Sequence, residues 1–156
     1  MGFNNLNDMA TFTQILYQIV FSTKNAEKTM RLDNSEKLYR YIWGILNNKK
    51  CKLYQINGTE NHLHILTHIH PTVSVASLIK DIKVSFSTWL KQERLFPNFV
   101  SWQEGYGAFT YHITQKDMLI NYIKKQREHH HTKTFREEYI ELLNEHGIEF
   151  DEKYLL

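Results

Sequence analysis

The chain has 156 residues, of which 42% are hydrophobic and 23% are charged, and its formal net charge is +2. This composition argues against intrinsic disorder, the length predicts a single domain over residues 1–156, and so small a charge does not by itself indicate a polyanionic partner. A single cysteine, Cys51, excludes an intramolecular disulfide framework, and no apolar stretch is long enough to span a bilayer, so we expect a cytoplasmic protein without a membrane anchor.

The N-terminal part of the chain predicts one strand and one helix. Met1–Asp8 lacks both the basic segment and the apolar core of an export signal. Thr13–Thr23 alternates apolar side chains on both of its faces, which is typical of a central strand covered on both sides. Asp33 and Glu36 have the spacing of a helix-capping pair, and the apolar residues that follow repeat with a helical period, so we expect a helix over about Asn34–Asn48.

A β-hairpin is predicted next. Its strands are two short β-prone runs, Cys51–Ile56 and His62–Thr67. The dipeptide Asn57-Gly58 stands between them and readily adopts the positive φ of a tight hairpin connection. We therefore expect a short turn at this dipeptide and a second strand that carries two histidines.

The histidine pair of this hairpin is the first candidate site. His62 and His64 alternate with apolar residues, and alternate side chains of a strand point to the same face, so both imidazoles should share one surface. Such a pair can bind a metal ion, but it can equally consist of hydrogen-bonded structural histidines. His68 and His70 continue the same phase and form an alternative pair, although Pro71 is expected to end the strand there.

The middle of the chain predicts a long helix and a fourth strand. After Pro71, an apolar stripe with helical period runs from Val75 to Leu90. Gly105 and Gly107 then interrupt the pattern before a β-prone segment over Ala108–Ile113. We read these segments as a second amphipathic helix followed by the last strand of the sheet.

The next predicted helix carries the second half of the candidate site. Thr114 and Asp117 favour a helix start, and the helical pattern should fray near His131. Residues four apart on a helix lie on one surface, so Tyr122 and Gln126 can address the same point in space. Taken alone, Tyr122 would be an ordinary aromatic residue of an amphipathic helix. The glutamine four residues later strengthens its interpretation as a functional residue.

The last predicted helix begins at a capping box formed by Thr134 and Glu137, and Gly147 can end it. The resulting order is strand, helix, two strands, helix, strand and two helices. It predicts an α+β fold of the ferredoxin-like (split βαβ) type, an antiparallel sheet with helices on one face, plus C-terminal helices that carry the tyrosine. The other sheet face would remain available for a ligand or a second subunit.

Three segments together resemble a known family. They are the His62-Leu63-His64 motif after Gly58-Thr59-Glu60-Asn61, the stretch from Trp102 to Phe109, and the helix segment Tyr122-Ile123-Lys124-Lys125-Gln126. The chain resembles the short insertion-sequence transposases of the single-tyrosine HUH class (IS200-like), which mobilise DNA as single strands. By this resemblance, His62, His64 and Gln126 would be metal ligands, and Tyr122 would be the nucleophile that becomes joined to a DNA 5′-phosphate.

The resemblance also implies cofactors and partners. Mixed imidazole and amide ligation suits Mg²⁺ or Mn²⁺, and a phenol with a pKa of about 10 needs a polarised phosphate or a base to attack at neutral pH. Similar transposases act as homodimers in the bacterial cytoplasm, associated with the nucleoid. They recognise DNA hairpins near the ends of the mobile element, and the histidines of one subunit can complete a site with the tyrosine helix of the other.

Several basic side chains are weaker candidates for DNA contact. The lysines and arginine that could form a backbone-binding track are Lys80, Lys83, Lys124, Lys125 and Arg127, although solvated lysines are common on helices. The consecutive histidines at 129–131 cannot share one helix face, so we interpret them as a solvated helix end that can touch phosphate.

Two other functions fit the same residues. One is a metal-dependent single-strand nuclease or nickase, in which water can take the place of Tyr122 as the attacking group. The other is a non-catalytic module that binds single-stranded nucleic acid by aromatic stacking on the sheet. A covalent protein–DNA adduct that depends on Tyr122 would separate the transposase from both.

Overall fold

The computed structural model describes residues 11–155. Its centre is a four-stranded antiparallel sheet with the order β2-β3-β1-β4. The strands are β1 (Leu16–Ser22), β2 (Lys52–Gly58), β3 (His62–His68) and β4 (Gly107–Tyr111). The predicted α+β, split βαβ architecture is confirmed, because the elements follow the order βαββαβ and β1 and β3 form the centre of the sheet. Met1–Asp8, where we expected no export signal, lies outside the described residues.

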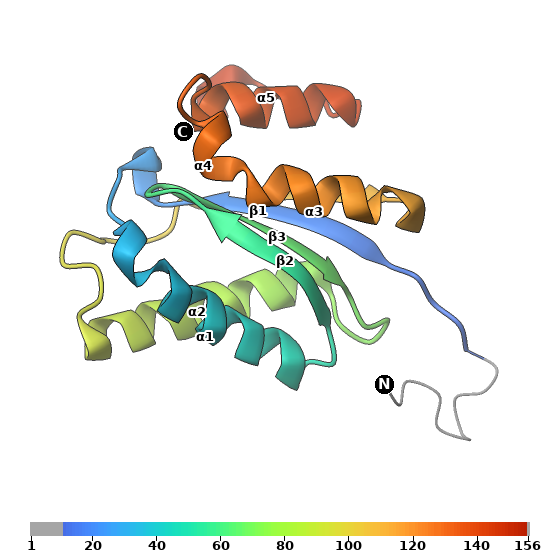
Figure 1. Cartoon of the computed structure of the whole chain (residues 1–156), viewed down its shortest axis with the longest axis horizontal. Helices are drawn as coiled ribbons and strands as arrows, with labels where there is room; N and C mark the ends of the chain where they lie inside the picture. The colour runs from blue at the N-terminus through green and yellow to red at the C-terminus, as the bar shows by residue number, and fades with distance from the viewer. Residues whose placement is uncertain (1–10, 156) are drawn as a thin grey trace.

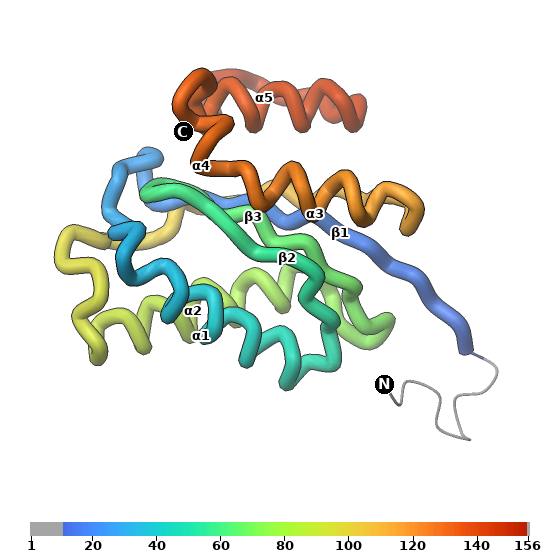
Figure 2. The backbone as a smooth tube through the Cα atoms, in the orientation of Figure 1, coloured from blue at the N-terminus to red at the C-terminus, as the bar shows by residue number. Residues whose placement is uncertain are grey.

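Helices cover both faces of this sheet (Figures 1 and 2). On one face lie α1 (Ser35–Asn48) and α2 (Val75–Glu93); on the other lie α3 (Lys116–Lys124), α4 (Gln126–His129) and α5 (Phe135–Glu145). Short 3₁₀ turns lie at Lys24–Ala26, Leu32–Asn34, Ile113–Gln115 and Glu152–Tyr154. Within the described chain, no helix has both the length and the apolar composition that crossing a bilayer requires.

The expectation that one sheet face stays open is wrong. On β1, Ile19 and Phe21 pack against the layer of α1 and α2, as the alternation predicts. The opposite face carries Leu16 and Val20, which pack against the C-terminal helices. These apolar side chains would otherwise be exposed to water, so their burial accounts for the docking of α3 and α5 on this face.

The hairpin between β2 and β3 turns later than predicted. Asn57 and Gly58 still belong to β2 and pair with β3, so the connection is residues 59–61. Neither residue has a positive φ, and the prediction of a tight turn at this dipeptide is therefore wrong. Gly58 has a different role: a Cβ atom there would lie 2.2 Å from the backbone oxygen of His62, so only glycine permits this close approach of the two strands.

Helix ends agree with the sequence at the C-terminus and differ elsewhere. The Thr134 hydroxyl accepts a hydrogen bond from the Glu137 backbone N–H at 3.1 Å and opens α5, and Gly147 with φ +64 follows its end, as predicted. The predicted cap of α1 does not form. Asp33 lies in the preceding 3₁₀ turn and pairs with Arg31 at 2.9 Å instead.

The tyrosine helix is interrupted where one continuous helix was predicted. It is preceded by a 3₁₀ turn in which His112 Nδ1, rather than the Thr114 side chain, accepts a hydrogen bond from a backbone N–H. α3 then ends at Lys124, Lys125 leaves helical geometry, and a short helix α4 begins at Gln126. Tyr122 and Gln126 therefore lie on two helical segments, and their spacing alone does not decide whether their side chains meet.

Candidate active site

A group of polar side chains is buried between the sheet and the C-terminal helices. It comprises Gln18, His62, His64 and Gln126, which have no exposed surface, and Glu138, which is 1% exposed. Burial of polar groups costs free energy unless each finds a partner. The contacts of these side chains therefore determine what the group can do chemically.

Each imidazole of the histidine pair is held through its Nδ1 atom. His62 Nδ1 lies 2.7 Å from Asn61 Oδ1 and 2.9 Å from the Thr59 hydroxyl. His64 Nδ1 lies 2.7 Å from Gln18 Oε1. An amide oxygen can only accept, so in both rings Nδ1 carries the hydrogen. This outer support leaves the Nε2 atoms as the groups that face the centre of the cluster.

A carboxylate from α5 lies at that centre. Glu138 Oε1 is 2.9 Å from His64 Nε2, 3.2 Å from His130 Nε2 and 3.6 Å from His62 Nε2. One ligand atom from each of His62, His64 and Glu138 lies within 4.8 Å of the others. This buried His–His–Glu cluster is consistent with a metal site on the predicted histidine pair.

The tyrosine and the glutamine reach the same carboxylate through its other oxygen. Tyr122 donates its hydroxyl hydrogen to Glu138 Oε2, and Gln126 Nε2 donates to the same atom at 3.0 Å. The amide oxygen of Gln126 then faces His62 Nε2 at 3.2 Å. Despite the break at Lys125, the two side chains meet at one point, as their spacing predicted.

The donor atoms fit a divalent cation. With its hydrogen on Nδ1, a neutral His62 turns an acceptor nitrogen toward the acceptor oxygen of Gln126, and a proton or a cation would have to mediate that contact. The same holds for His64 Nε2 and Glu138 Oε1. Neighbouring ligands at about 2.0–2.1 Å from Mg²⁺ in octahedral geometry lie about 3 Å apart, which is close to the observed separations of 3.2 Å and 2.9 Å.

The protonation states in the metal-free cluster follow from burial and contacts. Burial, with the neighbouring His64 and His130, lowers the pKa of His62 well below its usual value, so this ring is neutral at neutral pH. Burial alone would raise the pKa of Glu138, but the contacts of its carboxylate with the imidazoles of His130 and His64 outweigh it and hold this pKa well below the usual range. A neutral imidazole and an ionised carboxylate are the forms that bind metals.

The environment of Tyr122 keeps its phenol protonated. Burial and the neighbouring carboxylate of Glu138 both raise the pKa of this tyrosine above its ordinary value. The ring stacks on His129, with centroids 5.0 Å apart and planes inclined by 29°. The hydroxyl is thus positioned beside the histidine pair and remains protonated at neutral pH while it donates to Glu138.

Two members of the cluster were missed by the sequence analysis. The interpretation of residues 129–131 as a solvated helix end is wrong for His130, which contacts Glu138, and for His129, whose ring stacks on Tyr122 and whose Nε2 atom is buried. Glu138 itself was not considered. A signal for it existed, because Phe135, Glu138 and Leu142 have the i, i+3, i+7 spacing of a buried helix face, and a carboxylate on such a face needs partners.

The predicted basic track is divided between two faces of the molecule. Lys80 and Lys83 lie on α2, across the sheet from the histidine pair, and Lys83 donates to the backbone oxygens of residues 103 and 105 at 2.9 and 2.7 Å. Lys124 and Lys125 are exposed near the junction of α3 and α4. Arg127 follows on α4, where it donates to neutral groups, the Ser35 hydroxyl and the Gly58 backbone oxygen.

The alternative histidine pair is not brought to the cluster. His68 Nδ1 accepts a hydrogen bond from the Ile15 backbone N–H at 3.2 Å, and His70 Nδ1 lies 2.7 Å from the Thr72 hydroxyl. Among the residues that the structure describes, His62, His64 and Glu138 form the one group of three or more His, Cys, Asp or Glu side chains close enough together to hold a metal ion. The choice of His62 and His64 over the second pair therefore agrees with the geometry.

The fold and the site define the class of protein. A histidine pair on a central strand, close to a tyrosine and a glutamine from the C-terminal helices, is consistent with the resemblance to the single-tyrosine HUH transposases. Residues 11–126 match a family model described as transposase IS200 like, and the chain belongs to this family.

Two solved structures share the fold. One is a candidate transposase from Deinococcus radiodurans R1, 18% identical with a TM-score of 0.55, over 81% of this chain and 98% of that one. The other is a REP-associated tyrosine transposase bound to a REP hairpin, 12% identical with a TM-score of 0.59, over 77% of this chain and 71% of that one. At these identities the similarity supports the fold alone. No curated protein matches the sequence.

Proposed function

We propose that this protein cleaves and rejoins single-stranded DNA at the ends of an insertion sequence, through a covalent bond between Tyr122 and a DNA 5′-phosphate. The observation that carries the proposal is the convergence of Tyr122, His64 and Gln126 on one buried carboxylate, in a chain of the IS200-like transposase family. The nucleophile and the metal-binding groups of such a reaction thus lie around a single point.

The residues that would hold a divalent cation, Mg²⁺ or Mn²⁺, are His62, His64 and Gln126, with Glu138 as an additional ligand before DNA is bound. When bound, the cation would withdraw charge from the scissile phosphate. Gln18 and Asn61 would keep the two Nε2 atoms directed at it by accepting the Nδ1 hydrogens.

Tyr122 performs the covalent step. Its hydroxyl oxygen forms a bond to phosphorus as the bond between phosphorus and the 3′ oxygen breaks, and the phenol proton is transferred, on balance, to that leaving oxygen. The products are a 5′-phosphotyrosine and a free 3′-OH. Because one phosphoester replaces another, the reverse attack by a 3′-OH can reseal a strand without an external energy source.

DNA must displace Glu138 before this step. His62 and His64 have no exposed surface, and the carboxylate occupies the space between them and Tyr122. Like the carboxylate of Glu138, a scissile phosphate carries anionic oxygens, and it would contact the same groups. We therefore propose that the phosphate replaces Glu138 as α5 moves outward, which also removes the carboxylate that keeps the phenol protonated.

The decisive experiment is detection of the covalent adduct. The protein is incubated with a library of single-stranded oligonucleotides and Mn²⁺, and tyrosine-linked products are mapped by mass spectrometry. We expect an adduct on Tyr122 that is absent with chelator and absent in Tyr122→Phe. Tyr54→Phe is the matched control, because Tyr54 also packs beside α3 but lies outside the cluster.

The other outcomes distinguish the alternatives. Cleavage that survives Tyr122→Phe and forms no adduct would instead identify a metal-dependent nuclease. Binding that is insensitive to both the substitution and the chelator, without cleavage, would identify a nucleic-acid-binding module. Either result would overturn the proposed strand transfer.

We further propose that the partners are DNA hairpins at the element ends and a second copy of the chain. One solved relative is bound to a REP hairpin, which supports the first. Two DNA ends must be held at once, which supports a homodimer with one site per copy. We further propose that each site is built within one subunit, because Tyr122 and His64 of one chain contact the same Glu138.

A mixture of the Tyr122→Phe and His64→Ala variants should then fail to restore the adduct. Restoration of the adduct would indicate that the sites are shared between subunits.

A further inference from the structure

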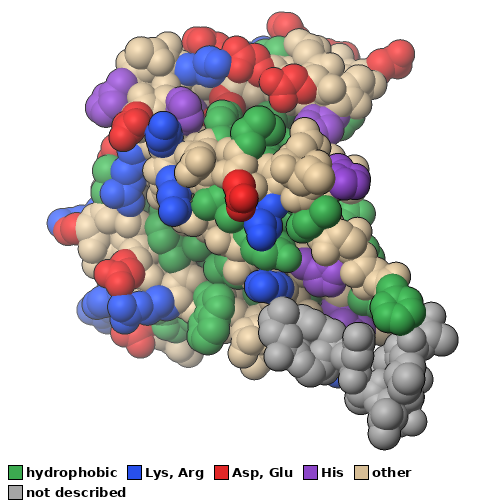
Figure 3. Space-filling model, turned by 45° about the vertical axis from the view of Figure 1, so that its right-hand side comes forward, with side chains coloured by type: hydrophobic (Ala, Val, Ile, Leu, Met, Phe, Trp, Pro, Cys, Tyr) green, Lys and Arg blue, Asp and Glu red, His purple; other side chains and the backbone are tan. Residues whose placement is uncertain are grey.

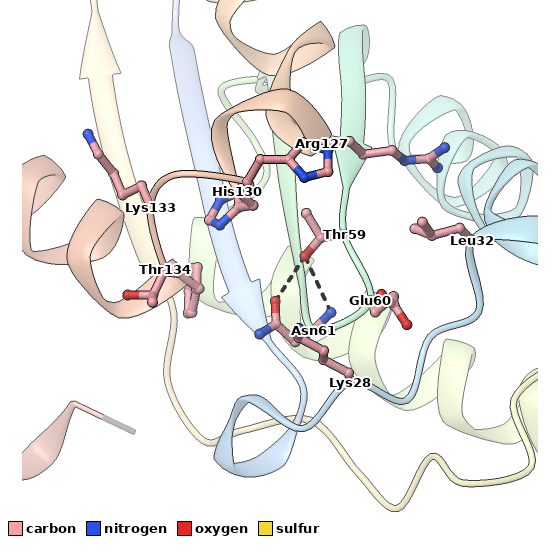
Figure 4. A pocket seen from close by; sticks show the side chains of 11 residues that line it. Lys28, Leu32, Thr59, Glu60, Asn61, Arg127, His130, Lys133 and Thr134 are labelled. Carbon is pink, nitrogen blue, oxygen red and sulfur yellow. Dashed lines mark hydrogen bonds between the residues drawn. The ribbon is translucent and has the colours of Figure 1, made fainter.

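A cleft of about 350 Å³ lies directly beside the buried cluster (Figure 4). Its walls come from the segment between β1 and α1, from the turn between β2 and β3, from α4, and from the segment that leads into α5. The lining residues on which the inference depends are Lys28, Leu32, Thr59, Asn61, Arg127 and Phe135. This volume is at the lower end of the range for small-molecule sites. It suits a ligand about as large as one nucleotide and is too small for a duplex.

The cleft shares its inner wall with the metal-binding histidine. Thr59 and Asn61 line it and also hold His62 Nδ1, at 2.9 and 2.7 Å. The ring of Phe135 stacks on the His62 ring with centroids 4.3 Å apart, and the His130 ring lies 4.4 Å from it. A ligand in the cleft would therefore be separated from His62 by one layer of side chains.

The charge of the lining favours an anion. Lys28 forms no hydrogen bond or salt bridge with the part of the chain that is described, and the described partners of Arg127 are neutral. Lys133 is neutralised by Glu141 at 2.5 Å and points away from the cleft in Figure 4. The one acidic lining residue is Glu60. Two cations are thus available to an incoming negative group.

Charged side chains are unevenly distributed over the wider surface. Figure 3 shows many Lys and Arg side chains on the left of the view, below two histidines and interspersed with several acidic ones, while acidic side chains dominate the top of the molecule, over α5. A polyanion would be repelled from the outer side of α5 and attracted to the level of α3 and α4.

We propose that this cleft binds one nucleotide of the single strand next to the scissile phosphate, with its phosphate between Lys28 and Arg127. The inference rests on the proposed function and adds a docking position from which the next phosphate can reach His62 once Glu138 is displaced. Sugar and base contacts would come from Leu32 and the polar side chains of Thr59 and Asn61. The strand is then held before chemistry, independently of the metal.

Binding measurements without metal test this site. Fluorescence anisotropy of a labelled single-stranded oligonucleotide in chelator is compared for the wild type, Lys28→Ala and the control Lys91→Ala, an exposed lysine on α2. We expect Lys28→Ala to weaken binding about three- to tenfold and to reduce the slope of log K against log salt by about 0.7, the loss of one phosphate contact. Lys91→Ala should change neither quantity.

Arg127 needs a second variant, because its contacts with Ser35 and Gly58 also support the fold. Arg127→Ala should weaken binding like Lys28→Ala, and Arg127→Lys, which retains the charge, should restore most of the affinity. Thermal unfolding of each variant identifies any loss that comes from destabilisation. If Lys28→Ala and a folded Arg127→Ala both bind like the wild type, the cleft is not the docking position.

Crosslinking separates this inference from the proposed function. An oligonucleotide with 4-thiothymidine at successive positions should crosslink to the cleft lining from one position only, flanking the nucleotide that becomes joined to Tyr122. An adduct on Tyr122 together with crosslinks outside the cleft would overturn the proposed docking position but leave the proposed strand transfer intact. Crosslinks in the cleft without any adduct retain the binding site and overturn strand transfer.

Discussion

The two faces of the sheet are formed by the same strands, but one belongs to the apolar core and the other to the candidate active site. Toward α1 and α2, β1 and β3 present Ile19, Phe21, Leu63 and Ile65, which form a continuous apolar core. Toward α3–α5, the alternate residues include Gln18, His62 and His64, which are equally buried. The first face stabilises the fold through burial, whereas the second arranges polar groups whose buried positions are sustained by hydrogen bonds.

This comparison teaches that burial alone does not distinguish a core residue from a site residue. Leu63 and His64 are adjacent and have 1% and 0% exposure. What differs is the partner across the interface, which is apolar for Leu63 and a carboxylate for His64. Substitutions on the first face should therefore change stability, and those on the second should change metal binding and chemistry.

The largest effect is expected on the apolar face. Phe86→Ala removes a fully buried ring of α2 and should lower the free energy of unfolding by about 3–5 kcal/mol, because it leaves a cavity. Val84→Ala, at a 58% exposed position of the same helix, should stay within about 0.5 kcal/mol. Urea unfolding measures both. If the folded Phe86→Ala variant has a changed affinity for Mn²⁺, the inference that the apolar face affects stability and not metal binding is wrong.

On the polar face, Gln18→Leu should weaken Mn²⁺ binding about 10–100-fold, because His64 Nδ1 loses the acceptor that orients its ring. Gln18→Glu retains an acceptor oxygen and should keep most of the affinity. Isothermal titration calorimetry with folded variants is the measurement. Equal affinities for Gln18→Leu and the wild type would show that the ring needs no outer support.

The metal-free protein should lose stability in mild acid. The pKa of His62 is lower in the folded chain than in the unfolded one, so below pH of about 6.5 the unfolded state binds the additional proton and unfolding becomes more favourable. The loss should not exceed about 1.4 kcal/mol per pH unit for this group. Melting temperatures between pH 8 and pH 5 test it: a plateau above pH 7 and a decline below are expected. His62→Gln should flatten the decline.

The smallest effect is expected at Glu138. Glu138→Gln removes the anionic group that the scissile phosphate must displace from His64 and Tyr122, and it should accelerate adduct formation about three- to tenfold at saturating Mn²⁺. It should also weaken Mn²⁺ binding in the absence of DNA. Single-turnover gels measure the rate. If a folded Glu138→Gln forms no adduct, this carboxylate takes part in catalysis and is not simply displaced by DNA.

Much of the fold was predictable from local patterns. The two-residue alternation placed His62 and His64 on one face, the helical stripe indicated α2, and the Thr134 cap with Gly147 bounded α5. These features depend on side chains a few residues apart, so their physical causes are contained in short segments. The turn at Asn57-Gly58 was wrong because the pairing of β2 with β3 extended the strands through it.

The tertiary structure alone decided how the site is completed. The sequence by itself determined that two imidazoles share a strand face and that Tyr122 and Gln126 have helical spacing. It did not determine that Glu138 would lie between them, since this residue is 74 positions from His64 and reaches it only after α5 packs on Val20 and Phe109. A buried carboxylate finds its partners through packing over long separations, and no periodicity in the chain encodes that contact.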